Sequence, residues 1–189
     1  EIRWVPVPEV ATRVAQVETG ELDFADDLNL DAFDRVKRNP GARPIVSKPY
    51  YWLVAVFNKK EGLMTNQKLR QAWQAALDME PIMKGVAGGR SEFYRMDASL
   101  AFVENAPWHV KPAGLPWNEN NKEKAKRLLK EAGYKGEPIT ILHATDHAYI
   151  NPANLVMIQQ LRKAGFLKLD VQAMDWGSVT KRRLNNNDP

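Results

Sequence analysis

The spacing of apolar residues after residue 58 predicts amphipathic helices. In the segment from Thr65 to Leu77 the apolar side chains recur at i, i+3, i+4, i+7 and i+8, which places them on one buried stripe. Thr65 or Asn66 can cap this helix. Pro81 fits the first turn of a second helix, which we expect to end in a run of glycines. The stripe of the first helix consists of Leu69, Ala72, Trp73, Ala76 and Leu77.

The chain up to Asn58 alternates between strand-like and helix-like patterns. Short runs rich in β-branched and aromatic residues indicate strands, and Val10, Val14 and Val17 follow a helical spacing that ends at Gly20. The predicted order, β-α-β-α-β-β, is typical of an α/β layer and not of a sandwich. The predicted strands are 2–7, 21–25, 42–48 and 50–58, and the predicted helices are 8–20 and 29–39.

The remaining chain predicts a second α/β unit. Residues 90–119 show no periodicity and carry several aromatic residues and prolines. We therefore expect a long ordered loop that packs against another part of the structure. Asn120 or Asn121 can cap the helix that follows, and Gly133 ends it. The last predicted elements are a strand at 138–144, a helix at 151–165, a strand at 167–176 and a helix at 177–184.

Composition narrows the function classes. The chain has 27 Lys and Arg against 23 Asp and Glu, and these basic residues are interleaved with acids, so no nucleic-acid partner is indicated. With no cysteine, the chain has no disulfide, thiolate nucleophile or Cys-based zinc site. No apolar run is long enough to cross a bilayer. We interpret both ends as cuts within a longer polypeptide, so the absence of a targeting segment does not locate the parent protein.

Two histidines and an acid form the only cluster that suggests catalysis or metal binding. His143 falls at the end of a predicted strand, and Asp146 and His147 fall in the following loop. Because the two histidines do not share a helix, we expect no metal site, and loop residues facing a ligand cleft fit better. No G-x-S-x-G elbow or phosphate-binding glycine motif accompanies them.

Aromatic residues are the other candidates for ligand contact. Trp73 lies on the apolar stripe and belongs to the expected core. Tyr94, Trp108 and Trp117 lie in irregular chain, where the pattern leaves open both a buried ring and a cleft-lining ring. Trp176 follows a strand and leaves the same alternatives open.

Several phrases, in order, resemble one protein family. They are "GELDF", "VFNKKEGLMTNQKLRQAWQAALDMEPIMKGVAGG", "NKEKAKRLLKEAGYKGEPITI" and "NPANLVMIQQLRKAGFLKLDVQAMDWGSVTKRR". Together they are similar to the family 5 extracellular solute-binding proteins, the peptide, nickel and opine receptors of bacterial ABC importers. The phrase "FYRMDASL…WH" further resembles a peptide-transporter subgroup. The resemblance spans essentially the whole chain.

The resemblance implies an α/β fold like that of type II periplasmic binding proteins, with mixed sheets flanked by helices. It implies a fragment of a two-lobed cleft protein, with residues 1–58 in the first lobe and 59–189 forming most of the second. The parent would be periplasmic or lipid-anchored outside the membrane, and would deliver a peptide or similar solute to an ABC permease. The resemblance also places the Asp that holds a peptide's amino group beyond the end of this chain, so Asp188 is not assigned that role.

We therefore expect a binding protein without catalytic residues, metal or cofactor. Arg95 could pair with a ligand carboxylate, although a surface or interlobe ion pair is an equal alternative. Two other hypotheses stay open: an α/β enzyme with His143 or His147 as base, and a module whose exposed aromatics bind another protein. We expect the fragment alone to bind ligand weakly and to self-associate through surface that a missing lobe would cover. The candidate ligand contacts are Tyr94, Arg95, Trp108, His109, Asp146, His147, Tyr149 and Trp176.

Overall fold

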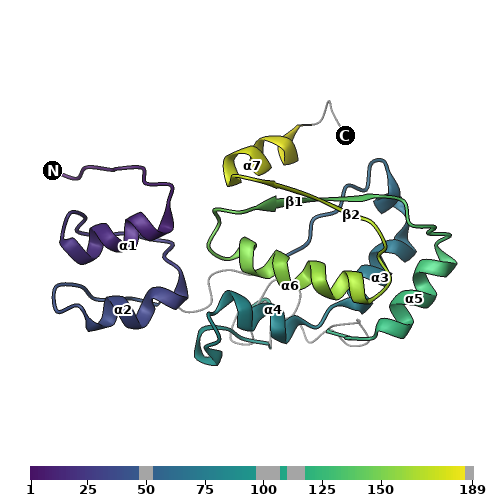
Figure 1. Cartoon of the computed structure of the whole chain (residues 1–189), viewed down its shortest axis with the longest axis horizontal. Helices are drawn as coiled ribbons and strands as arrows, with labels where there is room; N and C mark the ends of the chain where they lie inside the picture. Colours follow the sequence, from purple (N-terminus) through teal and green to yellow (C-terminus); the bar gives the residue numbers. More distant parts are fainter. Residues whose placement is uncertain (47–52, 97–106, 110–117, 186–189) are drawn as a thin grey trace.

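The computed structural model of the chain describes residues 1–46, 53–96, 107–109 and 118–185. In Figure 1 the two N-terminal helices lie to one side, and the remaining helices surround a small sheet. Within the described ranges, every helix is too short or too polar to span a membrane. The elements are α1 (Val10–Thr19), η1 (Leu30–Ala32), α2 (Phe33–Arg38), η2 (Leu63–Thr65), α3 (Gln67–Ala76), α4 (Met79–Val86), η3 (Ser91–Phe93), α5 (Lys122–Glu131), β1 (Ile139–Ala144), α6 (Ile150–Lys163), β2 (Leu169–Met174) and α7 (Trp176–Leu184).

The main core lies between α3, α5, α6 and the sheet. Trp73 of α3 meets Phe166, which follows α6, with ring centroids 5.6 Å apart at 75°. Aromatic pairs favour this edge-to-face arrangement. Phe166 and Leu69 are almost completely buried. The apolar stripe predicted for the segment from Thr65 to Leu77 is thus confirmed as the face that α3 packs against the rest of the domain.

The sheet is a parallel pair joined by a helical crossover. β1 pairs with β2 in a register that sets Ile139 against Leu169 and Ala144 against Met174. Parallel strands need a long connection between them, and α6 supplies it. Both α6 and α7 contact β1, and Figure 1 shows the two helices above and below the strands. The β-α-β order predicted for this part of the chain is confirmed.

Side chains at the ends of α3 and α5 fix these two helices in an antiparallel pair. Asn66 caps α3 by accepting from the Lys68 amide, and its own amide donates to the Ala132 carbonyl beyond the end of α5. Asn121 caps α5 by accepting from the Lys124 amide. Of the alternatives left by the sequence, Asn66 and Asn121 are therefore the caps.

The N-terminal helices are held together by a few polar contacts. Gly20 takes the left-handed conformation at φ 75° and ends α1 as predicted. Arg35 of α2 forms an ion pair with Glu18 of α1, and the Asn39 side-chain amide donates to the Glu18 carbonyl at 2.8 Å. These contacts make α1 and α2 one small unit.

The strands predicted before residue 58 are wrong for the residues that the structure describes. Residues 2–7, 21–25, 42–46 and 53–58 contain no strand, while 47–52 lie outside the described residues. Within the described chain the only strand pairing is β1 with β2. A strand needs a neighbour to take its backbone N–H and C=O groups. These segments keep the apolar composition of strands but have no such neighbour in the part of the chain that the structure describes.

Helix boundaries shift by a few residues from the predicted ones. α1 begins at Val10 and not at Pro8, and α7 begins at Trp176 because Asp175 caps it. α4 begins at Met79, so Pro81 lies in its first turn, and Gly85 lies within the helix. Most of the long loop predicted at 90–119 falls outside the described residues, apart from η3 and the neighbouring short stretches.

Candidate functional site

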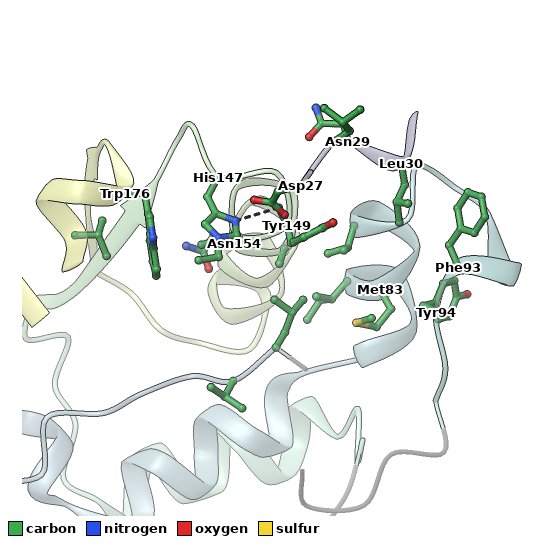
Figure 2. A pocket seen from close by; sticks show the side chains of 18 of the residues that line it. Asp27, Asn29, Leu30, Met83, Phe93, Tyr94, His147, Tyr149, Asn154 and Trp176 are labelled. Carbon is green, nitrogen blue, oxygen red and sulfur yellow. Dashed lines mark hydrogen bonds between the residues drawn. The ribbon is translucent and has the colours of Figure 1, made fainter. Parts of the chain in front are cut away.

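A large cavity of about 2620 Å³ lies between the N-terminal segment, α4, the strand β1 and the segments that follow β1 and β2. We call it the main cavity. Figure 2 shows His147, Tyr149, Asn154 and Trp176 on one side of it, and Leu30, Met83, Phe93 and Tyr94 on the other. Ligand sites typically combine such aromatic and apolar walls with a few polar groups.

The loop between β1 and α6 supplies two of the predicted residues to the main cavity. In open α/β sheets ligands bind beyond the carboxyl ends of the strands, and His147 and Tyr149 lie at this position. The Tyr149 backbone N–H donates to His147 Nδ1 at 3.3 Å, and the two rings are 6.0 Å apart. Both side chains are half-buried and line the main cavity.

Trp176 lies at the carboxyl end of β2 and completes this wall. Its ring meets the His147 ring edge-on, with centroids 4.9 Å apart at 73°. The Arg183 guanidinium from the later turns of α7 lies 5.6 Å from the Trp176 ring centre. This separation is within the range of a cation–π contact. His147, Trp176 and Arg183 thus form a continuous aromatic and cationic surface, all of which lines the main cavity.

Asp146 has a structural role at the edge of this wall. Its carboxylate accepts a hydrogen bond from the Trp176 backbone N–H at 2.8 Å, which ties the β1–α6 loop to the start of α7. Asp146 lines a smaller neighbouring cavity of about 300 Å³, together with His147 and residues of α1. It therefore helps to position Trp176 next to His147.

His143 is removed from the cavity and joined to α6. Its side chain is 5% exposed, and Nε2 lies 2.8 Å from Asn151 Oδ1. Because a side-chain amide oxygen can only accept, Nε2 must carry the proton and donate it. That nitrogen is not available as a base. The described residues contain no group of three or more His, Cys, Asp or Glu side chains placed to hold a metal ion.

Tyr94 and Arg95 line the main cavity from the segment after η3. Tyr94 is half-buried and Arg95 is exposed. They face the cavity from the side opposite Trp176, as Figure 2 shows for Tyr94. The structure thus brings Tyr94, Arg95, His147, Tyr149 and Trp176 around one cavity.

Trp108 and His109 are not among the described residues that line the main cavity. Trp108 is 69% exposed and His109 is half-buried. The residues on either side of this pair, 97–106 and 110–117, lie outside the described chain. Their role as ligand contacts stays a prediction.

Several cavity-lining residues were not predicted. Asp26 and Asp27 line the main cavity, and Arg182 and Arg183 line it from α7. Asn29 also lines it, and its buried Oδ1 has no hydrogen-bond partner among the described residues. The position of Arg183 two turns after Trp176 offered a signal, because helical spacing places it near the ring.

Comparisons with known proteins place this geometry in a family. Residues 1–189 match the family described as bacterial extracellular solute-binding proteins, family 5 Middle. A probable peptide ABC transporter periplasmic-binding protein, y4tO of Sinorhizobium fredii, is 31% identical over 91% of this chain and 32% of its own length. The glutathione-binding protein GsiB of Pectobacterium atrosepticum is 28% identical over 93% of this chain and 33% of its own.

A solved structure shows the same fold. The oligopeptide-binding protein AppA from Bacillus subtilis, in complex with a nonapeptide, superposes with a TM-score of 0.71 at 22% identity, covering 96% of this chain and 37% of AppA. The chain thus spans about a third of the length of these relatives. Because the family match extends over all 189 residues, the chain belongs to the bacterial extracellular solute-binding proteins of family 5.

Proposed function

We propose that the chain is part of the substrate-binding component of an ABC importer, which captures a peptide in a cleft between two lobes and delivers it to the permease. The observation that carries this proposal is the main cavity, which runs along β1 and reaches His147 and Trp176 in the segments after β1 and β2, in a chain of this family. The division into a first lobe at 1–58 and a second at 59–189 belongs to the same proposal. The named relatives bind peptides or glutathione, which supports a peptidic ligand.

The walls of the main cavity suit a peptide. The aromatic surface of His147, Tyr149 and Trp176 can pack against apolar side chains or peptide planes. Such contacts give affinity for many sequences, because they do not depend on one side-chain hydrogen-bond pattern.

The charges around the main cavity suit the two ends of a zwitterionic peptide. The segment with Asp26 and Asp27 is acidic, and the wall formed by α7 carries Arg182 and Arg183. Carboxylates attract an amino group, and guanidinium groups bind carboxylates through paired hydrogen bonds. We propose that the peptide carboxylate lies towards Arg183, next to Trp176. The acidic segment adds to the attraction of the amino group, whose direct partner the family resemblance places outside this chain.

The proposed role involves binding without chemistry on the ligand. The relatives are named as binding proteins, and the Nε2 atom of His143 is committed to Asn151. We place the parent protein in the periplasm, or outside the membrane on a lipid anchor. The enzyme alternative predicts a turnover that disappears in His147→Ala, which can be measured with peptide substrates by mass spectrometry.

Thermal shifts of the full-length receptor that contains this chain test the proposal. A ligand that binds only the folded state raises Tm, so a library of di- to nonapeptides should contain sequences that raise it. Trp176→Ala should reduce the shift, and Lys126→Ala should leave it unchanged, because Lys126 pairs with Glu123 on α5 outside the cavity lining. No shift with any peptide in the library, while the receptor is folded, would contradict a peptidic ligand.

A further inference from the structure

Arg90 lies between two aromatic rings from distant parts of the chain. Its guanidinium is 5.0 Å from the ring centre of Phe33 at the start of α2 and 4.7 Å from that of Phe93 in η3. The two rings also touch each other, with centroids 5.0 Å apart at 63°. Guanidinium groups favour the faces of aromatic rings. Arg90 therefore bridges the N-terminal helices and the segment that follows α4.

Two carboxylates hold the same guanidinium in place. Arg90 Nη1 lies 2.7 Å from Asp34 Oδ2 on α2, and Nη2 lies 2.7 Å from Glu92 Oε1 in η3. The hydrogen bond from Arg90 is the main reason that the pKa of Asp34 is lowered from its ordinary value. The Arg90 side chain is 29% exposed, less than either acid. One side chain thus makes an ion pair and a ring contact on each of the two segments.

A backbone contact two residues earlier joins the same parts of the chain. Gly88 has φ +59°, and a Cβ atom built there would lie 3.3 Å from the Asp31 backbone N and Cα. A side chain at this position would be strained by the positive φ and would push against the Asp31 backbone, and glycine avoids both costs. Residues 31–34 and 88–93 are therefore in contact at two independent points.

These contacts lie directly behind the wall of the main cavity. Phe33 and Phe93 line it, and Tyr94 follows Phe93 in the chain. We propose that Arg90 is a positioning residue, a latch between α2 and η3 that fixes the N-terminal helices against the segment after α4 and holds Tyr94 at the wall of the main cavity. The latch holds these two parts of the chain in place whether or not a ligand is bound, so this inference goes beyond the proposed function.

Distance measurements on the ligand-free chain test the latch. Because the chain has no cysteine, spin labels can be attached specifically to a pair introduced by Thr19→Cys and Lys84→Cys. These exposed positions lie on α1 and α4, outside the Arg90 contacts. Double electron–electron resonance should give one narrow distance distribution with Arg90 present. Arg90→Ala should increase the fraction outside this peak by about tenfold, because it removes two ring contacts and two ion pairs at once.

Two further variants separate the latch from a general loss of packing. Arg90→Lys keeps the charge but loses the planar group that stacks on both rings, so it should give an intermediate distribution. Arg127→Ala removes a guanidinium from an ion pair within α5 and should leave the distribution unchanged. A circular dichroism spectrum checks that each variant is folded. A folded Arg90→Ala chain with the parental distribution would overturn the proposal.

The backbone contact provides a second test if Arg90→Ala fails to fold. Gly88→Ala and Gly89→Ala both place a side chain at positive φ, but a Cβ at Gly89 meets no atom within 4 Å. The difference between the two variants therefore isolates the contact with Asp31. We expect Gly88→Ala to broaden the distance distribution more than Gly89→Ala does. Equal distributions for the two variants would show that residues 31–34 do not rest on this turn, and would also overturn the latch.

Discussion

Single residues at the centre of the core determine how far the domain resists unfolding. Phe166 is 1% exposed and contacts Trp73 edge-to-face, while a second ring, Tyr134, lies 6.2 Å away. Its neighbour Leu167 is 76% exposed. Two adjacent residues thus differ almost completely in burial, which gives a matched pair for mutation.

We predict that Phe166→Ala lowers the free energy of unfolding by about 3–5 kcal/mol, because it removes buried surface and leaves a cavity. Leu167→Ala should change it by less than about 0.5 kcal/mol, as is usual for exposed positions. Urea unfolding followed by circular dichroism measures both. Equal effects of the two substitutions would show that Phe166 is not part of the cooperative core.

The stability of the start of α7 depends on pH through the Asp175 carboxylate. It accepts hydrogen bonds from the side chain and the backbone N–H of Ser178, and these lower its pKa from the ordinary 3.8. A group with a lowered folded pKa stabilises the fold above its ordinary pKa, and this contribution is lost as the pH falls through the lowered value. The wall residue Trp176 is the first residue of the helix that this cap begins.

We predict that the NMR signal of the Ser178 amide moves as the pH falls below about 4, where Asp175 takes up its proton. Asp175→Asn keeps a capping oxygen that does not titrate. In that variant the Ser178 signal should stay constant over the same range. A similar shift in both proteins would show that another group causes the change.

At the scale of elements, one junction joins three parts of the fold. Gln160 of α6 forms two hydrogen bonds with the backbone of Asp78, accepting from its N–H at 2.8 Å and donating to its C=O at 3.0 Å. The Asp78 side chain caps α4 and accepts from the Asn120 amide at 2.9 Å. Asn118 accepts from the next amide, Met79, at 2.6 Å. The turn between α3 and α4 is thus held by polar groups from two later segments.

We predict that Gln160→Ala lowers the free energy of unfolding by about 1–3 kcal/mol, because both backbone groups of Asp78 lose their partner. Gln159→Ala, on the exposed side of the same turn of α6, is the control and should have little effect. Hydrogen exchange of the Asp78 amide reports the same junction locally. Unchanged protection of this amide in Gln160→Ala would contradict the assignment.

The helices and the β1–α6–β2 unit were predictable from the sequence because each carries its own signal. Leu69, Trp73 and Ala76 define the buried face of α3 by their spacing. The cavity was only partly predictable. Trp176 follows a strand and was identified by position, but Met83 lines the cavity from within a helix, where nothing in the pattern distinguishes it. Contacts that depend on tertiary packing, such as the one between α2 and η3, leave no local pattern.

At the scale of the whole molecule, the segments that were wrongly predicted as strands bear on whether the chain associates with itself. The pattern of Val54 and Val56 is that of a strand, but strand formation depends on a partner and not on composition alone. Val54 and Val56 are 63% and 71% exposed, and Ile2 and Trp4 are 82% and 84% exposed. Exposed apolar segments of this kind favour association.

We predict that the chain self-associates through these segments as its concentration rises. Sedimentation velocity over a wide concentration range should show a species larger than the monomer. The double substitution Val54→Lys and Val56→Lys should shift the distribution to monomer, because charges on an unpaired edge prevent pairing. The same substitutions at Leu155 and Leu184, which are exposed on helices, are the control. A monomer at every concentration would contradict this prediction.

The junction at Asp78 also bears on how the polypeptide folds as a ribosome synthesises it. Gln160 follows Asp78 by 82 positions, and Asn120 follows it by 42. The turn between α3 and α4 therefore emerges from the exit tunnel well before the side chains that satisfy its backbone have been translated. The first helical hairpin must therefore wait, partly solvated, until α6 has emerged.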